Sequence, residues 1–240
     1  MCKVKNSIIL FSLFVLCVFW GCRQSEQIRE APRAALVLKT LDSPFFSSLR
    51  QGAEEAAAEA GLDLTVQAAE RQVDVQQQMQ VIESLIEAKV DVLLIDPIGS
   101  GEVLSRIMKA NEAGIPVLIL DTRIDSTSAA ERGVEIAAFV GYDNYQGGVV
   151  AGEFILARTR GKTNVVILEG IPGHETADSR RKGFVAAIKG RDGVQILASQ
   201  PANWERAQGF TVRQELLNAQ PDLNVVFACN DMMALGAVEA

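Results

Sequence analysis

Short apolar runs alternate with longer amphipathic segments along most of the chain. The runs AALVLK, DLTVQA, DVLLID and IPVLIL are separated by segments with helical periodicity at about 45–60, 73–88 and 100–113. Continuous apolar strands between helices are typical of a parallel sheet that is covered on both faces. Gly61 and Gly114 follow two of the helices at positions where a left-handed cap is favoured.

A second series follows a polar stretch, TRIDSTSAAERG, which begins directly after Asp121. After the apolar stretch VEIAAFVG, helical patterns at about 146–159, 176–190 and 204–219 surround the strand-like runs NVVILE, VQILAS and NVVFAC. Two βαβ series predict an α/β protein with two doubly wound parallel-sheet lobes, at 34–137 and 138–240. The last helix, DMMALGAVEA, reaches Ala240 without a cap or a following strand, so we expect a C-terminally truncated second lobe.

The first residues have the pattern of an export signal. Lys3 and Lys5 precede the apolar run 8–21, which is shorter than the roughly 20 residues that cross a bilayer. We therefore predict a signal peptide at 1–22 and a linker at 23–33. The pair Gly21–Cys22 resembles the processing site of bacterial lipoproteins, although Phe19 and Trp20 depart from the usual residues before it, and lipidation is expected at Cys22. Plain cleavage and an uncleaved anchor are the alternatives.

Composition excludes several kinds of function. Cys229 is the only cysteine beyond position 22, so no internal disulfide is expected, and its apolar surroundings predict a core residue. The net charge of −7 and the lack of a basic cluster argue against nucleic acid as a partner. The single histidine, His174, has no partners that would make a metal site, and no serine has a recognisable histidine–acid set. We expect no catalysis, metal or cofactor.

Polar and aromatic residues gather where the predicted strands end. In open parallel sheets, ligands bind outside the carboxyl ends of the strands. There the sequence places 39–46, Asp96 with Pro97, and 121–123 in the first lobe, and 169–180, 199–204 and 230–231 in the second. Carboxylates, amides and arginines bind vicinal hydroxyls, and aromatic faces cover the C–H side of a sugar ring. No glycine-rich phosphate loop is present, so a neutral sugar is favoured over a phosphorylated ligand.

Three blocks, LVLKTLDSPFF, SQPANWERAQGF and VFACNDMMALGA, resemble the ribose and allose group of periplasmic sugar-binding proteins. These are type I periplasmic binding proteins and serve bacterial ABC importers. The resemblance covers the chain after residue 33 and implies that a monosaccharide binds between two hinged lobes. It also implies a set of sugar-contacting residues, which are Lys39, Ser43, Phe45, Phe46, Asp121, Arg180, Trp204 and Asn230.

Five of these residues also have a structural interpretation; Lys39 could be an exposed lysine at a strand end. Asp121 and Asn230 could cap turns or helices, Arg180 could be a solvated helix charge beside Arg181, and Trp204 could be a core aromatic. Asp231 is expected to be the N-cap of its helix.

More detailed predictions concern the orientation of Phe45 and Phe46 and the type of sugar that Lys39 indicates. Phe45 and Phe46 are both predicted to face the ligand, while the α-helical stripe Leu49, Ala53 and Ala56 faces the sheet. Lys39 matches the allose-like branch, and Asp121–Thr122 replaces the Asp–Arg of ribose binders. Both features favour a hexose such as allose over ribose.

The leading prediction is thus a substrate-binding lipoprotein of an ABC sugar importer. We expect a monomer in the periplasm or cell envelope, anchored through Cys22, with an inner-membrane permease as its partner. A sugar receptor for chemotaxis or a sensor kinase is one alternative. The effector domain of a lac-repressor-type regulator is another, disfavoured by the export signal in the place of a DNA-binding segment. Because family members continue beyond the point that matches Ala240, we expect weak sugar binding by the 240-residue chain, or none.

Overall fold

The computed structural model describes residues 31–240. The predicted signal peptide, Cys22 and most of the predicted linker lie outside the described residues. None of the helices within 31–240 is both long and apolar enough to cross a bilayer.

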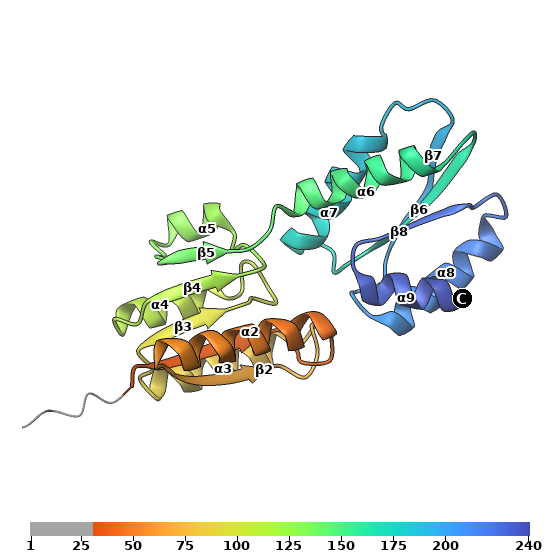
Figure 1. The fold of residues 1–240 in the computed structure, drawn as a ribbon. Helices are drawn as coiled ribbons and strands as arrows, with labels where there is room; N and C mark the ends of the chain where they lie inside the picture. Colours follow the sequence, from red (N-terminus) through yellow and green to blue (C-terminus); the bar gives the residue numbers. More distant parts are fainter. Residues whose placement is uncertain (1–30) are drawn as a thin grey trace, which may run out of the picture. The chain divides into compact units, whose positions relative to one another are not determined.

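The first sheet has five parallel strands in the order β2-β1-β3-β4-β5 (Figure 1). Its strands are β1 (Arg33–Leu38), β2 (Asp63–Ala68), β3 (Val92–Ile95), β4 (Val117–Leu120) and β5 (Ala138–Val140). The helices between them are α2 (Pro44–Ala60), α3 (Val75–Glu87), α4 (Leu104–Glu112) and α5 (Ser126–Glu131). The strand order reverses between β1 and β3, so the sheet is doubly wound, as predicted.

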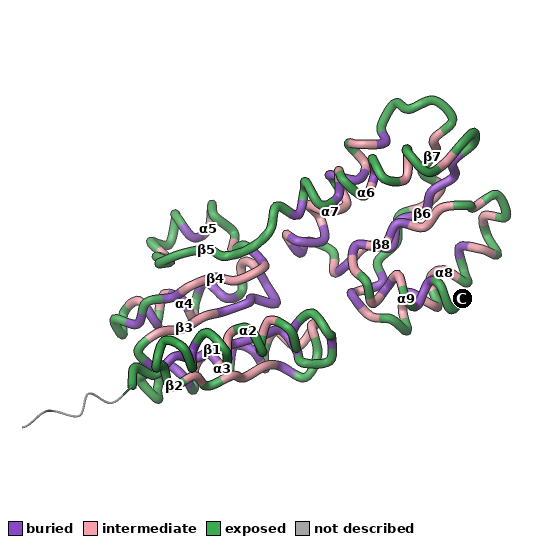
Figure 2. The backbone as a smooth tube through the Cα atoms, viewed as in Figure 1, coloured by how far each residue is buried: buried purple, intermediate pink, exposed green. Residues whose placement is uncertain are grey.

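Strand β1 shows why the apolar runs are continuous. Ala35 and Val37 pack into one buried cluster with residues of α3 and α4, whereas Leu36 and Leu38 pack into another with Phe46 of α2. Alternate side chains of a strand point to opposite faces, so a sheet with helices on both sides needs apolar residues at every position. Figure 2 shows the resulting buried segments along the strands and exposed ones along the helices.

The second sheet has three described parallel strands in the order β7-β6-β8. Its strands are β6 (Thr163–Glu169), β7 (Val194–Pro201) and β8 (Val225–Ala228). The helices of this half are α6 (Asn144–Arg158), α7 (Glu175–Ile188), α8 (Arg206–Ala219) and α9 (Asp231–Glu239). Phe184 and Phe227 stack at a centroid distance of 4.0 Å in the core of this half.

Two details differ from the sequence-based expectation. The polar stretch after Asp121 contains a short helix, α5, because Asp125 caps it by accepting a hydrogen bond from the Ser128 backbone amide. Strand β5 pairs with β4, so the predicted boundary between 137 and 138 falls just before a strand of the first sheet. We propose that the first lobe extends through β5 and that the second lobe begins at α6.

The glycine caps were predicted correctly. Gly61 and Gly114 have φ values of 67° and 73°, in the left-handed region that a side chain disfavours. At both glycines the chain turns from the end of a helix towards the start of the next strand. Successive strands therefore begin at the same edge of the parallel sheet.

Candidate ligand-binding site

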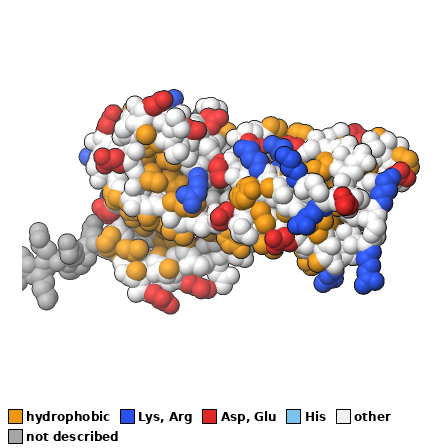
Figure 3. Space-filling model, turned by 90° about the horizontal axis from the view of Figure 1, so that it is seen from above, with side chains coloured by type: hydrophobic (Ala, Val, Ile, Leu, Met, Phe, Trp, Pro, Cys, Tyr) orange, Lys and Arg blue, Asp and Glu red, His pale blue; other side chains and the backbone are white. Residues whose placement is uncertain are grey.

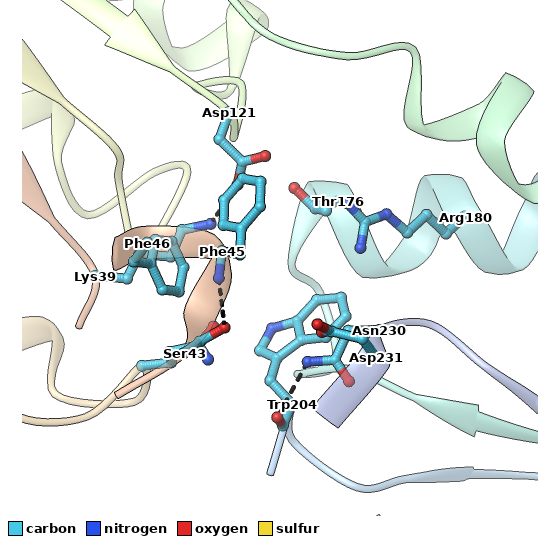
Figure 4. A pocket seen from close by; sticks show the side chains of 11 residues that line it. Lys39, Ser43, Phe45, Phe46, Asp121, Thr176, Arg180, Trp204, Asn230 and Asp231 are labelled. Atoms are coloured by element: carbon cyan, nitrogen blue, oxygen red, sulfur yellow. Dashed lines mark hydrogen bonds and ion pairs between the residues drawn. The ribbon is translucent and has the colours of Figure 1, made fainter. Parts of the chain in front are cut away.

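Loops at the carboxyl ends of the strands enclose a cavity of about 260 Å³. Its volume lies below the roughly 300–1,000 Å³ typical of pockets for drug-sized molecules, so it suits a small ligand. The cavity is lined by Lys39, Ser43, Phe45, Phe46, Gln72, Asp121, Thr176, Arg180, Trp204, Asn230 and Asp231. All eight residues of the predicted set are among them, and Figure 4 shows how their side chains converge from both lobes.

Lys39 forms the centre of a buried charge cluster behind this cavity. Its Nζ lies 2.9 Å from Asp121 Oδ2, 3.1 Å from Asp96 Oδ1 and 2.6 Å from Thr122 Oγ1. Lys39 and Asp96 follow β1 and β3, the two neighbouring strands at which the strand order reverses. The parallel register therefore brings a lysine and carboxylates together from positions far apart in the sequence.

Burial and charge act differently on the three ionisable groups. Burial raises the pKa of Asp96 to about 7, and the nearby Lys39 only partly opposes this. Burial would also raise the pKa of Asp121, but Lys39 and then Arg180 outweigh it and lower that pKa. Burial opposes the charge of Lys39, yet Asp96 and Asp121 raise its pKa above the ordinary value. Asp121 is therefore anionic at neutral pH, with Lys39 as its cation, whereas a pKa of about 7 leaves Asp96 only partly ionised there.

Both phenylalanines line the cavity, but they differ in burial. Phe45 is 47% exposed at the start of α2. Phe46 is only 4% exposed and also packs with Leu36 and Leu38 in the core. Residues at i, i+3, i+7 and i+11 share one helix face, and Phe46 therefore begins the buried stripe that ends at Ala57.

The predicted stripe of α2 also needs one correction. Leu49 and Ala53 pack against the core, as expected, but Ala56 is exposed and Ala57 is buried. Ser43 has a structural task as well as a place at the cavity, because its hydroxyl accepts a hydrogen bond from the Phe45 amide at the N-terminus of α2.

Arg180 and Trp204 form the wall contributed by the second lobe. Arg180 donates from Nε to Asn144 Oδ1 at 2.9 Å and from Nη1 to the Cys229 carbonyl at 2.8 Å, which fixes its guanidinium. The guanidinium carbon lies 5.9 Å from the centre of the Trp204 ring. The neighbouring Arg181 instead lies 3.8 Å from Glu169, so only one of the two adjacent arginines lines the cavity.

The Trp204 ring is held from behind by close packing. Its side chain occupies the space beside Gly170, where an added Cβ would lie 2.3 Å from a ring carbon. The ring of His174 meets it edge-on at a centroid distance of 5.9 Å. Trp204 itself has a φ of 69°, which is unfavourable for a bulky residue. Such backbone strain is concentrated at functional sites, where the surrounding structure enforces it.

Asn230 and Asp231 both line the cavity, and Asn230 rather than Asp231 caps the last helix. Asn230 is the N-cap of α9: its Oδ1 accepts from the Met233 amide, and its Nδ2 donates to the Trp204 carbonyl. The prediction that Asp231 is the N-cap is wrong, because Asp231 is the first residue of the helix and lines the cavity. Asn230 therefore couples the position of the indole to the start of α9.

Sequence reasoning missed Gln72 and Thr176 as cavity residues. Gln72 lies in the loop after β2, and the strand-end rule would have found that loop had it been applied to this strand. Thr176 lies in the first turn of α7, where a threonine gives no signal beyond that of an ordinary helix start.

Cys229 and His174 are both buried in the structure and do not line the cavity. Cys229 is 3% exposed in the core of the second lobe, as predicted, and burial raises the pKa of its thiol to about 12. His174 lies in the loop directly before α7, at the N-cap position, where it is only 5% exposed. Burial, followed by the charge of Lys39, lowers its pKa to about 4, so it is neutral at pH 7.

A protein-family model described as "Periplasmic binding protein domain" matches residues 34–240. The chain belongs to this family. The ribose import binding protein RbsB of Escherichia coli (strain K12) is 38% identical over 206 residues, which are 86% of this chain and 66% of RbsB. The chain thus spans about two thirds of the length of this relative.

Two further similar proteins are described with D-allose, one by its name and one by its bound sugar. The D-allose-binding periplasmic protein of Escherichia coli (strain K12) is 30% identical, over 92% of this chain and 71% of that protein. The crystal structure of an ABC transporter periplasmic solute-binding protein from Actinobacillus succinogenes 130z with bound D-allose is 40% identical. It superposes with a TM-score of 0.81 and covers 87% of this chain and 72% of that one.

Proposed function

We propose that the chain is the substrate-binding component of an ABC sugar importer and that its cavity takes a neutral monosaccharide. The charge balance of the cavity carries this proposal. Lys39 and Arg180 on its lining are matched by Asp121 and Asp231, and Lys39 is already paired with a buried carboxylate. A ligand with a net charge would leave one side chain without compensation in a poorly solvated site, which is costly.

The lining also provides the two kinds of contact that a sugar ring needs. Phe45 and Trp204 offer aromatic surface from different lobes for C–H groups, and Asp121, Arg180 and Asn230 offer hydrogen-bonding groups for hydroxyls. A ligand that contacts both lobes favours the arrangement in which they are close together. We therefore propose that the lobes close on the sugar through the segment 141–143 between β5 and α6.

The setting proposed for this function is the bacterial envelope. Relatives are named as import binding proteins and periplasmic proteins, which supports a periplasmic or envelope location and an inner-membrane permease as partner. Lipid anchoring at Cys22 and a monomeric state remain parts of the proposal. On the face displayed in Figure 3, acidic and basic side chains are interspersed with apolar ones, in keeping with a partner other than nucleic acid.

Fluorescence of Trp204 tests the proposal directly. A chain with Trp20→Phe has Trp204 as its only tryptophan. Of the two outcomes expected from the sequence, weak binding or none, we propose weak binding, because a cavity with all eight predicted residues is present within residues 31–240. Titration into the millimolar range with D-allose, D-ribose and D-galactose should therefore give a saturable change with at least one of them. Gluconate and ribose 5-phosphate should give none, because a charged ligand is disfavoured.

Two matched variants assign the response to the cavity. Asp121→Asn should weaken binding of the responding sugar at least tenfold, since it removes a charged hydrogen-bond acceptor. Asp222→Asn, which changes an exposed carboxylate with a side chain 76% accessible, should bind as the parent does. A folded parent chain that responds to no neutral monosaccharide, or equally to the charged ones, would sink the proposal.

A further inference from the structure

A chain of buried hydrogen bonds runs from Lys39 in the first lobe to Thr176 in the second. Lys39 Nζ lies 2.6 Å from Thr122 Oγ1, and Thr122 Oγ1 lies 2.9 Å from Thr176 Oγ1. The three residues are 4%, 0% and 3% exposed, so water does not compete for these bonds. Thr122 lies behind the cavity, whereas Thr176 lines it.

The ammonium group of Lys39 is surrounded by oxygens of the protein, with hydrogen bonds to Asp121 and Thr122 and an ion pair to Asp96. A lysine carries three N–H donors and no acceptor. Three oxygens surround Nζ at 2.6–3.1 Å, one each from Thr122, Asp121 and Asp96. The expectation that Lys39 itself reads a sugar hydroxyl is therefore not supported by this geometry.

The donor count and the distances together favour one direction for the chain. Because the ammonium only donates, Thr122 Oγ1 accepts from it and retains one hydrogen of its own. Two oxygens are within reach of that hydrogen: Thr176 Oγ1 at 2.9 Å, in a pair where either hydroxyl can donate, and Asp121 Oδ2 at 3.4 Å, a longer hydrogen bond. Donation over the shorter distance, from Thr122 to Thr176, leaves the hydrogen of Thr176 for an acceptor in the cavity that Thr176 lines (Figure 4).

We propose that Thr176 is a specificity-determining ligand contact whose hydroxyl donates to an oxygen of the bound sugar, and that Lys39 is a positioning residue which sets this direction through Thr122. The proposal rests on the proposed function and deepens it. The neighbouring Asp121 uses Oδ2 for Lys39, and its Oδ1 has no partner within residues 31–240, so it accepts from the ligand. The site thus offers one acceptor and one oriented donor side by side.

Monodeoxy sugars provide the decisive comparison. Calorimetric titration would use the sugar that binds most tightly among D-allose, D-ribose and D-galactose, together with its monodeoxy derivatives. Thr176→Val keeps the shape of the side chain and removes the hydroxyl, and it should weaken binding of the parent sugar by roughly 3- to 10-fold. For the one derivative that lacks the partner oxygen, the variant and the wild type should bind equally.

The same derivative tests the positioning role. Thr122→Val interrupts the chain but leaves both carboxylates their lysine, and its loss of affinity should vanish with the same derivative. Lys39→Met is a less clean test, because it also removes the cation of Asp121, so part of its loss should persist with this derivative. Thr176→Ser should restore binding, and Thr211→Val, at an exposed hydroxyl of α8, should change nothing.

The outcomes separate the two claims. Unchanged affinity in a folded Thr176→Val variant, or an equal loss for every derivative, overturns the inference while the proposed function stands. A wild-type chain that binds none of the neutral sugars overturns both. The two threonine variants decide, because neither removes the cation that pairs with Asp121.

Discussion

Asp96 and His174 are buried titratable side chains. Burial shifts their pKa values in opposite directions, upward for Asp96 and downward for His174. Burial raises the pKa of Asp96 from 3.8 to about 7, so the folded state holds a proton that the unfolded state loses. Its contribution to stability is present below pH 4 and is lost as the pH rises to 7. Burial lowers the pKa of His174 from 6.5 to about 4, so its contribution rises over nearly the same interval.

The two contributions should nearly cancel in the wild-type chain. Each changes by about 2 kcal/mol between pH 4.5 and 6.5, with opposite sign. In Asp96→Asn the free energy of unfolding should therefore rise over this interval, and in His174→Gln it should fall. Urea unfolding at the two pH values measures both slopes. Equal slopes in the two variants would contradict the opposed shifts.

For single residues, the sequence predicted which side chains meet at the cavity, but it did not predict all of their contacts. All eight predicted side chains line one cavity because the strand-end rule is geometric and follows from the parallel topology. Phe46 lines the cavity but also packs in the core, because adjacent helix residues differ by about 100° in direction and the packing of α2 decides which one is buried. The chain from Lys39 through Thr122 to Thr176 joins residues more than 50 positions apart, so no local pattern could have indicated it.

Among the elements, α6 and α7 approach each other through glycines. A Cβ added at Gly148 of α6 would lie 2.0 Å from the carbonyl oxygen of Arg180 on α7. One added at Gly183 of α7 would lie 1.9 Å from the Tyr145 carbonyl of α6. Because Arg180 lines the cavity from α7, the spacing of these two helices also sets the position of a cavity residue.

Adjacent glycines on α6 make a matched test of this contact. Gly148→Ala should lower the free energy of unfolding by about 1–3 kcal/mol through overpacking, and it should also weaken sugar binding. Gly147→Ala has nothing within 4 Å of the added carbon and should be neutral or stabilising by up to about 1 kcal/mol. Denaturant unfolding and sugar titration of both variants check this. Similar stabilities would show that the helices can separate at little cost.

Periodicity predicted the long elements well and the short ones poorly. The helices and strands with an apolar pattern were found near their observed bounds because burial imposes that pattern. Helix α5 has only six residues, and its polar sequence gives no periodic signal. Strand β5 has only three residues. It belongs to the first sheet because it pairs with β4, and the order of elements along the chain does not reveal that pairing.

For the whole molecule, the buried clusters divide by lobe. Two clusters draw only on residues before α6, and the third draws only on residues from α6 onwards. The polar contacts between lobes include the buried Thr122–Thr176 bond and an exposed ion pair of 3.1 Å between Arg71 and Glu205. Exposed ion pairs contribute little, so stability should reside largely within each lobe.

A pair of isoleucines tests this independence. Ile107 and Ile167 are 0% and 1% exposed, one in each lobe, and Ile→Val at either should cost about 1 kcal/mol. In the Trp20→Phe background, Trp204 fluorescence reports unfolding of the second lobe. Ile167→Val should shift that denaturant transition and Ile107→Val should not. Equal shifts from both variants would mean that the lobes unfold as one unit.

Gly170 has a consequence for how members of this family differ in ligand range. The indole of Trp204 lies in the space that any larger residue at position 170 would claim. A single methyl group there would drive the ring forward and make the cavity shallower, although position 170 is not part of its lining. The size of sugar admitted can therefore diverge between relatives whose contacting residues are all the same, so matching those residues alone is a poor guide to shared ligands.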